Sequence, residues 1–66
     1  MLSARNQFKG AVKSVKLGNV MAEVVVSIGN FEIVAAITRD SAERLGIRAD
    51  DTVTAGIKAT EVMIDK

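Results

Sequence analysis

Two neighbouring segments of the chain alternate in hydrophobicity, and each is apolar on both of its faces. The first runs from Val20 to Ile28 and the second from about Glu32 to Thr38, with the turn signal Gly29-Asn30 between them. A period of two predicts β-strands, and the short connection predicts a hairpin. One face carries Val20, Ala22, Val24, Val26, Ile28, Ile33, Ala35 and Ile37, and the other carries Met21, Glu23, Val25, Ser27, Val34, Ala36 and Thr38. Strands that are apolar on both faces are usually buried on both.

A chain of this size cannot bury both faces by itself. Its 66 residues are enough for one domain, residues 1–66, whose own core rarely supplies more than about 3–5 kcal/mol. The sequence contains neither cysteine nor histidine, so a disulfide or a histidine-bound metal cannot compensate. Association with further copies is the remedy that remains, and the second apolar face is therefore predicted to be a subunit interface. Scattered exposed apolar residues, common on protein surfaces, are the alternative.

Three more strands are predicted outside the hairpin. A first strand is expected from about Ser3 to Lys16, with Gly10 marking a bend or bulge. A fourth is expected from Thr52 to about Ala59, and a fifth from Glu61 to Ile64. Three strands, a short helix and two strands are the element order of an OB-type barrel. The predicted fold is therefore all-β, a five-stranded OB-like barrel with one short helix between strands 3 and 4.

Capping signals define the short helix. Asp40 is followed three residues later by Glu43, which is the spacing of a capping box with Asp40 as the N-cap. Gly46 can adopt the left-handed conformation that ends many helices. The helix is therefore expected to begin at Asp40 and to end before Gly46.

Composition excludes several classes of function. A net charge of +1 and only two aromatic residues argue against a nucleic-acid-binding module. Without histidine or cysteine there is no familiar catalytic triad, and no glycine-rich loop matches a phosphate-binding pattern, so the protein is not expected to be an enzyme. The opening residues do not resemble a signal peptide, and no apolar run is long enough to span a membrane. The cytoplasm is the expected compartment.

The remaining polar residues include a set of hydrogen-bond donors. Ser3-Ala4-Arg5-Asn6-Gln7 places four polar side chains in five residues, and Ile57-Lys58-Ala59-Thr60 places a cation and a hydroxyl near the end of the chain. Thr38 closes the third predicted strand on the face assigned to the interface. A tetrahedral dianion offers only acceptor oxygens, so its site requires cations, hydroxyls and backbone amides. These residues therefore suggest an oxyanion site.

Each of these residues also has an ordinary interpretation. Arg5 can be a solvated or salt-bridged residue near the terminus, and Lys58 can be an outward lysine that protects a sheet edge. Thr38 can serve only as a strand residue or as part of the turn into the helix. Asn6 and Gln7 can do no more than complete backbone hydrogen bonds. Spacing alone does not decide between the two interpretations.

Several blocks of residues resemble a known family. Ser-Ala-Arg-Asn-Gln at positions 3–7, followed by Lys9-Gly10, resembles the opening of molbindins (Mop-type proteins) and of the related TOBE domains of molybdate-responsive regulators. The resemblance continues, in order, through Ala22-Glu23-Val24-Val25, Ile37-Thr38, Glu43-Arg44-Leu45-Gly46 and residues 57–64. It covers essentially the whole chain.

The resemblance implies an assembly and a ligand. It implies that subunits exchange a strand and form a hexamer, a trimer of dimers, which holds molybdate, and similarly tungstate, at subunit interfaces. It implies no protein-ligated metal and no organic cofactor. By position, the oxyanion ligands fall on Ser3, Arg5, Thr38, Lys58 and Ala59, the last through its backbone amide, with Thr60 as an adjacent candidate. Since neither a DNA-binding nor an ATPase domain accompanies it, the chain resembles the freestanding form that stores or buffers molybdenum.

Two further hypotheses belong to other classes. The first is an OB-type module that binds single-stranded nucleic acid, and the second is an interaction module that assembles without any ligand. A salt-titrated binding assay with short single strands tests the former. Elemental analysis of the purified protein separates the latter from an oxyanion-binding protein.

Overall fold

The predicted hairpin is the centre of the fold. The computed structural model describes residues 4–66, in which β2 (Met21–Ile28) and β3 (Phe31–Thr38) pair antiparallel with Val25 opposite Val34. Ala22, Val24 and Val26 are buried, and their β3 neighbours on the same face are half-buried. On the opposite face Val34 is 62% exposed and Met21 is 47% exposed. The assignment of the two faces is therefore confirmed, and the second apolar face is open in the single chain.

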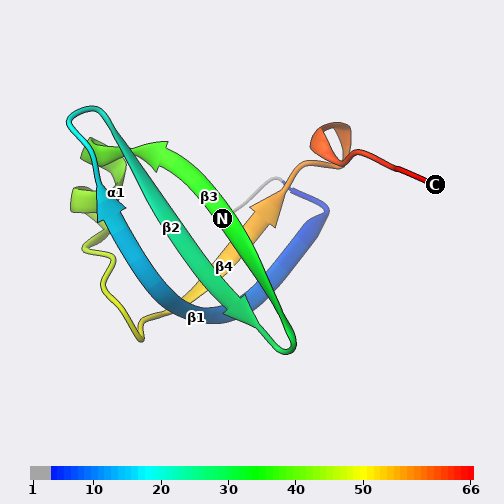
Figure 1. Cartoon of the computed structure of the whole chain (residues 1–66), viewed down its shortest axis with the longest axis horizontal. Coiled ribbons are helices and arrows are strands. Elements are labelled where there is room, and N and C mark those ends of the chain that lie inside the picture. Colours follow the sequence, from blue (N-terminus) through cyan, green and yellow to red (C-terminus); the bar gives the residue numbers. More distant parts are fainter. Residues whose placement is uncertain (1–3) are drawn as a thin grey trace.

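A long first strand connects the hairpin to the rest of the sheet. β1 (Asn6–Leu17) pairs with β2 through its second half and with β4 (Thr52–Ile57) through its first half, and Ala11 has partners in both. The sheet is four-stranded, in the order β3-β2-β1-β4, and Figure 1 shows β1 curving strongly along its length. The curvature brings the two edge strands, β3 and β4, around the same inner face.

Gly10 was predicted to mark a bend or a bulge, and the register of β1 has no bulge at this position. The irregularity of register in β1 lies between Val12 and Ser14, not at Gly10. A Cβ atom at position 10 would stand 2.4 Å from the carbonyl oxygen of Ser27 and 2.8 Å from the side chain of Ile28. Glycine is therefore required here because the backbones of β1 and β2 approach closely where the sheet bends.

The core is small and aliphatic. Val12, Val24 and Val26 form its centre, each no more than 3% exposed, and half-buried side chains pack around them: Val15, Ile28, Ala35, Ile37, Ile47 and Val53. α1 (Arg39–Leu45) contributes the buried Ala42 beside the ends of β2 and β3. Within residues 4–66 no polar or charged side chain is buried.

The helix ends as predicted but begins differently. Gly46 adopts a left-handed conformation with φ 62°, and its N–H donates to the carbonyls of Ala42 and Glu43. The prediction that Asp40 is the N-cap was wrong. Thr38 occupies that position with extended backbone angles and accepts a hydrogen bond from the Ser41 N–H, so Asp40 lies within the first turn. Both residue types cap helices well, and the pattern could not rank them.

The prediction of a five-stranded barrel was wrong for the single chain. β4 ends at Ile57, so Lys58 and Ala59 lie beyond it, and the chain turns into a short 3-10 helix, η1 (Ala59–Glu61). Among residues 4–66 no segment pairs with the free edges of β3 and β4. The fifth strand predicted from Glu61 to Ile64 does not form: Glu61 ends η1, residues 62–66 lead away from the sheet (Figure 1), and Met63 and Ile64 are 93% and 88% exposed.

An apolar groove lies where the fifth strand would close the barrel. It has a volume of about 580 Å³ and lies between the inner faces of β3 and β4. Its walls include Ile33, Ala35, Ile37, Leu45, Val53 and Ile57. The sheet is therefore a barrel with one side open.

The dimensions of the chain agree with an incomplete core. Its accessible surface is 5452 Å², whereas a compact monomer of 7.0 kDa exposes roughly 4,000 Å². Its radius of gyration is 12.1 Å, and a compact domain of this length has about 10.8 Å. The open groove, the outer face of the hairpin and the extended residues 62–66 all contribute to this surface.

Candidate functional site

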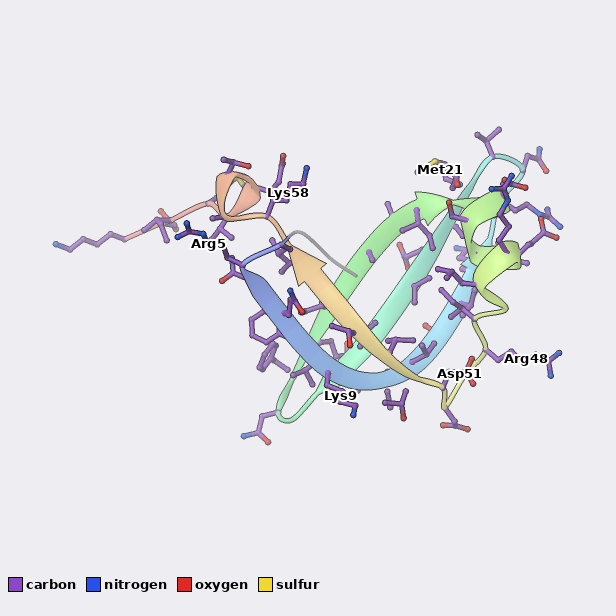
Figure 2. The ribbon with its side chains drawn as sticks, turned by 180° about the vertical axis from the view of Figure 1, so that it is seen from behind. Arg5, Lys9, Met21, Arg48, Asp51 and Lys58 are labelled. Atoms are coloured by element: carbon purple, nitrogen blue, oxygen red, sulfur yellow. The ribbon has the colours of Figure 1, made fainter. Side chains whose placement is uncertain are left out.

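Arg5 and Lys58 both lie at the same end of the sheet, each just beyond the paired part of its strand. Asn6 and Ile57 are the last paired residues of β1 and β4, and Arg5 and Lys58 are one position beyond them on neighbouring strands. Asn6 and Ile57 are half-buried, whereas Arg5 and Lys58 are exposed, so the two cations lie on the outer face. Figure 2 shows both of them at the end of the molecule that carries η1. The structure therefore brings together two cations that are 53 positions apart in the sequence.

Within residues 4–66 neither Arg5 nor Lys58 forms an ion pair with a carboxylate. Like charges opposite one another on neighbouring strands are destabilising. The ion pairs formed within residues 4–66 involve other cations, joining Lys13 to Glu32, Arg39 to Glu43, and Arg44 to Asp40. An anion between Arg5 and Lys58 would relieve their repulsion and accept charge-assisted hydrogen bonds from both.

Ala59 and Thr60 follow Lys58 as the first residues of η1. The carbonyl of Lys58 accepts a hydrogen bond from the Glu61 N–H at 2.9 Å, and the carbonyl of Ala59 accepts one from the Val62 N–H at 3.4 Å. Both residues are exposed next to Lys58, so the backbone N–H of Ala59 and the hydroxyl of Thr60 are at the same end as the cations. Ser3, the remaining candidate from the opening segment, lies outside the described residues.

Thr38 lies at the opposite end of the sheet. It pairs with Met21, the first residue of β2, close to the turn that follows β1. Figure 2 shows Met21 far from Arg5 and Lys58, and the longest dimension of the chain is 35 Å. One chain therefore does not bring Thr38 together with the two cations. A single oxyanion can contact all of these residues only where two chains meet.

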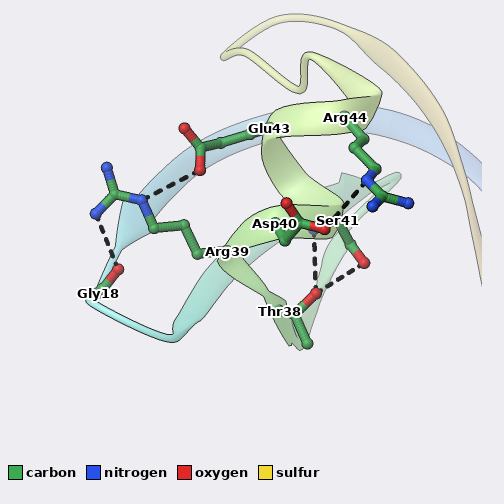
Figure 3. A network of polar contacts seen from close by, with 7 residues as sticks. All are labelled: Gly18, Thr38, Arg39, Asp40, Ser41, Glu43 and Arg44. Carbon is green, nitrogen blue, oxygen red and sulfur yellow. Dashed lines mark hydrogen bonds and ion pairs between the residues drawn. The ribbon is translucent and has the colours of Figure 1, made fainter.

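The hydroxyl of Thr38 forms a pair with that of Ser41. Thr38 Oγ1 donates to Ser41 Oγ at 2.8 Å and accepts from the Ser41 N–H at 3.1 Å, as Figure 3 shows. Both residues are exposed. Ser41 is a hydroxyl donor that the sequence pattern does not single out, because its place in the capping segment already accounts for it. Its position three residues after a candidate ligand, at the start of a helix, was the signal available.

The described residues were also compared with what a metal site or a membrane-spanning helix requires. Within residues 4–66 no three carboxylate side chains cluster closely enough to hold a metal ion. No helix in that part of the chain has the length and apolar character needed to cross a membrane.

Comparison with known proteins identifies the family. Residues 2–64 match the TOBE domain. The chain belongs to the TOBE domain family. It is 50% identical over 64 residues to molybdenum-pterin-binding protein 3 of Clostridium pasteurianum, an alignment that covers 96% of this chain and 94% of that protein. The family predicted from positions 3–7 and 57–64 is confirmed.

Solved structures support the same assignment. A molybdate-binding protein from Sporomusa ovata is 42% identical and superposes with a TM-score of 0.94, covering 100% of this chain and 98% of that one. The cytoplasmic molybdate-binding protein ModG, in a form with molybdate bound, is 36% identical with a TM-score of 0.88. That match covers 96% of this chain but 45% of ModG, so this chain spans less than half of ModG's length.

Proposed function

We propose that this protein binds molybdate between subunits, in sites formed by Arg5, Lys58 and Ala59 of one chain and Thr38 of another. The observation that carries the proposal is the position of Arg5 and Lys58 immediately beyond the paired ends of β1 and β4, without an ion-pair partner for either within residues 4–66. Ser3 and Thr60 complete the proposed set. The structure adds Ser41, whose hydroxyl is bonded to that of Thr38.

The chemistry of these donors suits a tetrahedral dianion. Arg5 and Lys58 supply two positive charges, and the hydroxyls and the backbone amide supply neutral donors that satisfy the remaining oxygens. Enclosure between chains lowers the local dielectric and strengthens each of these contacts. The names of the Sporomusa protein and of ModG, both molybdate-binding, support molybdate as the ligand.

The proposed assembly follows from the open side of the barrel. Residues 62–66 of one chain fill the groove between β3 and β4 of a second chain, as a fifth strand exchanged between subunits. The groove is apolar, and the apolar side chains of Val62, Met63 and Ile64 are 46%, 93% and 88% exposed in their own chain. The apolar outer face of the hairpin then buries itself against further copies. A hexamer, arranged as a trimer of dimers, is the assembly we propose.

The finer features of the function belong to the same proposal. The protein binds tungstate in the same sites, acts in storage or buffering of molybdenum in the cytoplasm, and catalyses no reaction. ModG, described as cytoplasmic, supports the compartment. A nucleic-acid-binding role is disfavoured by the net charge of +1.

A pterin-bearing ligand is the second candidate, because the Clostridium relative is named for molybdenum-pterin. A pterin ring would stack on an aromatic side chain. The two phenylalanines of this chain instead pack edge to face against each other, with ring centroids 6.2 Å apart. The inorganic oxyanion is favoured because the exposed groups at the site are cations and hydroxyls.

Calorimetric titration of the purified protein with molybdate, tungstate, sulfate and a reduced pterin tests the proposal. Saturable binding of molybdate and tungstate, with a melting temperature that rises with either, is the expected result. Elemental analysis of the protein as purified gives an independent measure of molybdenum content. An unchanged melting curve at millimolar molybdate contradicts the proposed function, and binding of the pterin alone supports the second candidate.

A further inference from the structure

Two consecutive carboxamides hold the peptide bonds that lead into the two cations. Asn6 Nδ2 donates to the carbonyl oxygen of Ile57 at 3.2 Å, and Gln7 Nε2 donates to the carbonyl oxygen of Ala4 at 2.7 Å. Ile57 immediately precedes Lys58, and Ala4 immediately precedes Arg5. Each amide therefore binds the peptide unit that carries the N–H of a cationic residue.

These hydrogen bonds restrict both cations because a peptide unit is planar. Fixing the carbonyl oxygen of Ile57 also fixes the orientation of the Lys58 N–H and Cα. The next peptide is held as well, because the Lys58 carbonyl accepts from the Glu61 N–H at 2.9 Å. Both peptide units that flank Lys58 are thus fixed.

The two amides act over different distances. The Asn6 side chain is half-buried and reaches from β1 to β4, where the paired part of the two strands ends. The Gln7 side chain is exposed and turns back three positions along its own strand. One amide therefore adds a cross-strand hydrogen bond where the paired region ends, and the other restrains the segment that carries Arg5.

A carboxamide is also the suitable group for this task beside an anion site. It donates a hydrogen bond to a carbonyl as an ammonium group can, but it adds no charge. A carboxylate would repel both the carbonyl and the bound oxyanion. Strands that diverged freely beyond Asn6 and Ile57 would let the two cations move apart to reduce their repulsion.

We propose that Asn6 and Gln7 are positioning residues that hold Arg5 and Lys58 at a fixed separation, matched to one size of tetrahedral dianion. This inference rests on the proposed function and deepens it. Holding the cations in place before binding reduces the ordering cost of binding, which raises affinity. A fixed separation also discriminates between molybdate and the smaller sulfate.

The test compares variants that lose the donor but keep the size of the side chain. Asn6→Leu and Gln7→Met are expected to weaken molybdate binding by about three-fold to ten-fold each, the effect of losing one hydrogen bond. The ratio of molybdate affinity to sulfate affinity should narrow in both, because a looser pair of cations selects less by size. Asn6→Gln, which keeps the amide, should recover part of the loss.

Asn30→Leu is the matched control, because Asn30 is exposed in the β2–β3 turn. It should bind both anions as the parent does. All variants are titrated as oligomers of parental size, confirmed by light scattering. Gln7→Met replaces an exposed side chain, so it decides the question if Asn6→Leu does not fold.

The outcomes separate this inference from the proposed function. If the parent and Asn30→Leu bind molybdate and the Asn6 and Gln7 variants bind it equally well, the positioning role is wrong and the proposed function stands. A loss of affinity that is equal for molybdate and sulfate, together with a lower melting temperature without ligand, indicates a purely structural role and also overturns the inference. A parent that binds no molybdate contradicts both.

Discussion

The hydroxyl of Thr38 faces that of Ser41 across 2.8 Å, and the same Thr38 oxygen accepts the Ser41 N–H at 3.1 Å. Thr38 therefore has a structural role as the N-cap of α1 in addition to its proposed role as a ligand. The cap bond is donated by the Ser41 backbone N–H and does not involve the Ser41 hydroxyl, which accepts a separate hydrogen bond from Thr38 Oγ1. The two residues allow stability and binding to be measured separately.

Thr38→Val should destabilise the protein even without ligand. Valine has the same shape but cannot accept the Ser41 N–H, and loss of such a cap costs about 1 kcal/mol. For a chain of this length the melting temperature should fall by roughly 4–8 °C. Thermal unfolding followed by circular dichroism measures it, with Thr38→Ser as the control that keeps the hydroxyl. Equal melting temperatures for Thr38→Val and the parent would show that the cap is not required.

Ser41→Ala should show the opposite combination of effects. It keeps the backbone N–H that Thr38 accepts and removes only the hydroxyl, so the melting temperature without ligand should stay near that of the parent. Molybdate affinity should fall by about three-fold to ten-fold, which corresponds to one neutral hydrogen bond. Calorimetric titration measures it. Parental affinity in Ser41→Ala would remove Ser41 from the site.

Replacing either paired cation should have the largest effect on binding. Arg5→Ala or Lys58→Ala leaves a dianion facing one cation, and a charge-assisted hydrogen bond contributes about 1.5–3 kcal/mol, so molybdate affinity should fall about ten-fold or more. Lys58→Arg should also weaken binding, because a planar guanidinium does not replace a compact ammonium.

Lys16→Ala is the control for these cation variants, because Lys16 is exposed in β1 and belongs to neither proposed group of ligands. It should bind molybdate as the parent does. If Lys16→Ala weakens binding and Lys58→Ala does not, the site has been placed at the wrong end of the sheet.

The hairpin and its two faces could be predicted because they depend on local alternation, which the chain satisfies internally. The prediction of a closing strand was wrong for the single chain, since residues 61–64 pair with no other segment of residues 4–66. Alternation shows that a segment can pair, but not which chain supplies its partner. The prediction of Asp40 as N-cap failed for a local reason: the end of β3 imposes extended backbone angles on Thr38, two positions earlier, and the helix begins directly after it.

The candidate site, too, could be predicted only in part from the sequence. The neighbourhood of Arg5 and Lys58 depends on the β1–β4 register, which no pattern in either segment reveals. The chemistry of each segment was visible in the sequence, whereas the separation of Thr38 from the cations became evident only from the fold.

Ile64→Asp should disrupt the assembly although Ile64 is 88% exposed in the single chain. If residues 62–66 fill the groove of a second chain, the new carboxylate is buried without a partner, which is strongly unfavourable. Light scattering should show smaller species at low micromolar concentration. Asn30→Asp adds the same charge at an exposed turn and should leave the oligomer intact. An Ile64→Asp protein of parental size would contradict the proposed strand exchange.

The central claim is that each site joins the Arg5–Lys58 end of one chain to the Thr38–Ser41 end of another. It is tested most directly by calorimetric titration of mixed oligomers, made by co-expressing Lys58→Ala chains with chains that carry Thr38→Val and Ser41→Ala, which lack both hydroxyls. Random mixing places an intact Lys58 opposite an intact Thr38–Ser41 pair in about a quarter of the sites. The account predicts that this fraction of sites regains parental molybdate affinity, which neither variant shows alone. Mixed oligomers that recover no parental sites would contradict it, because the two groups of ligands would then have to come from the same chain.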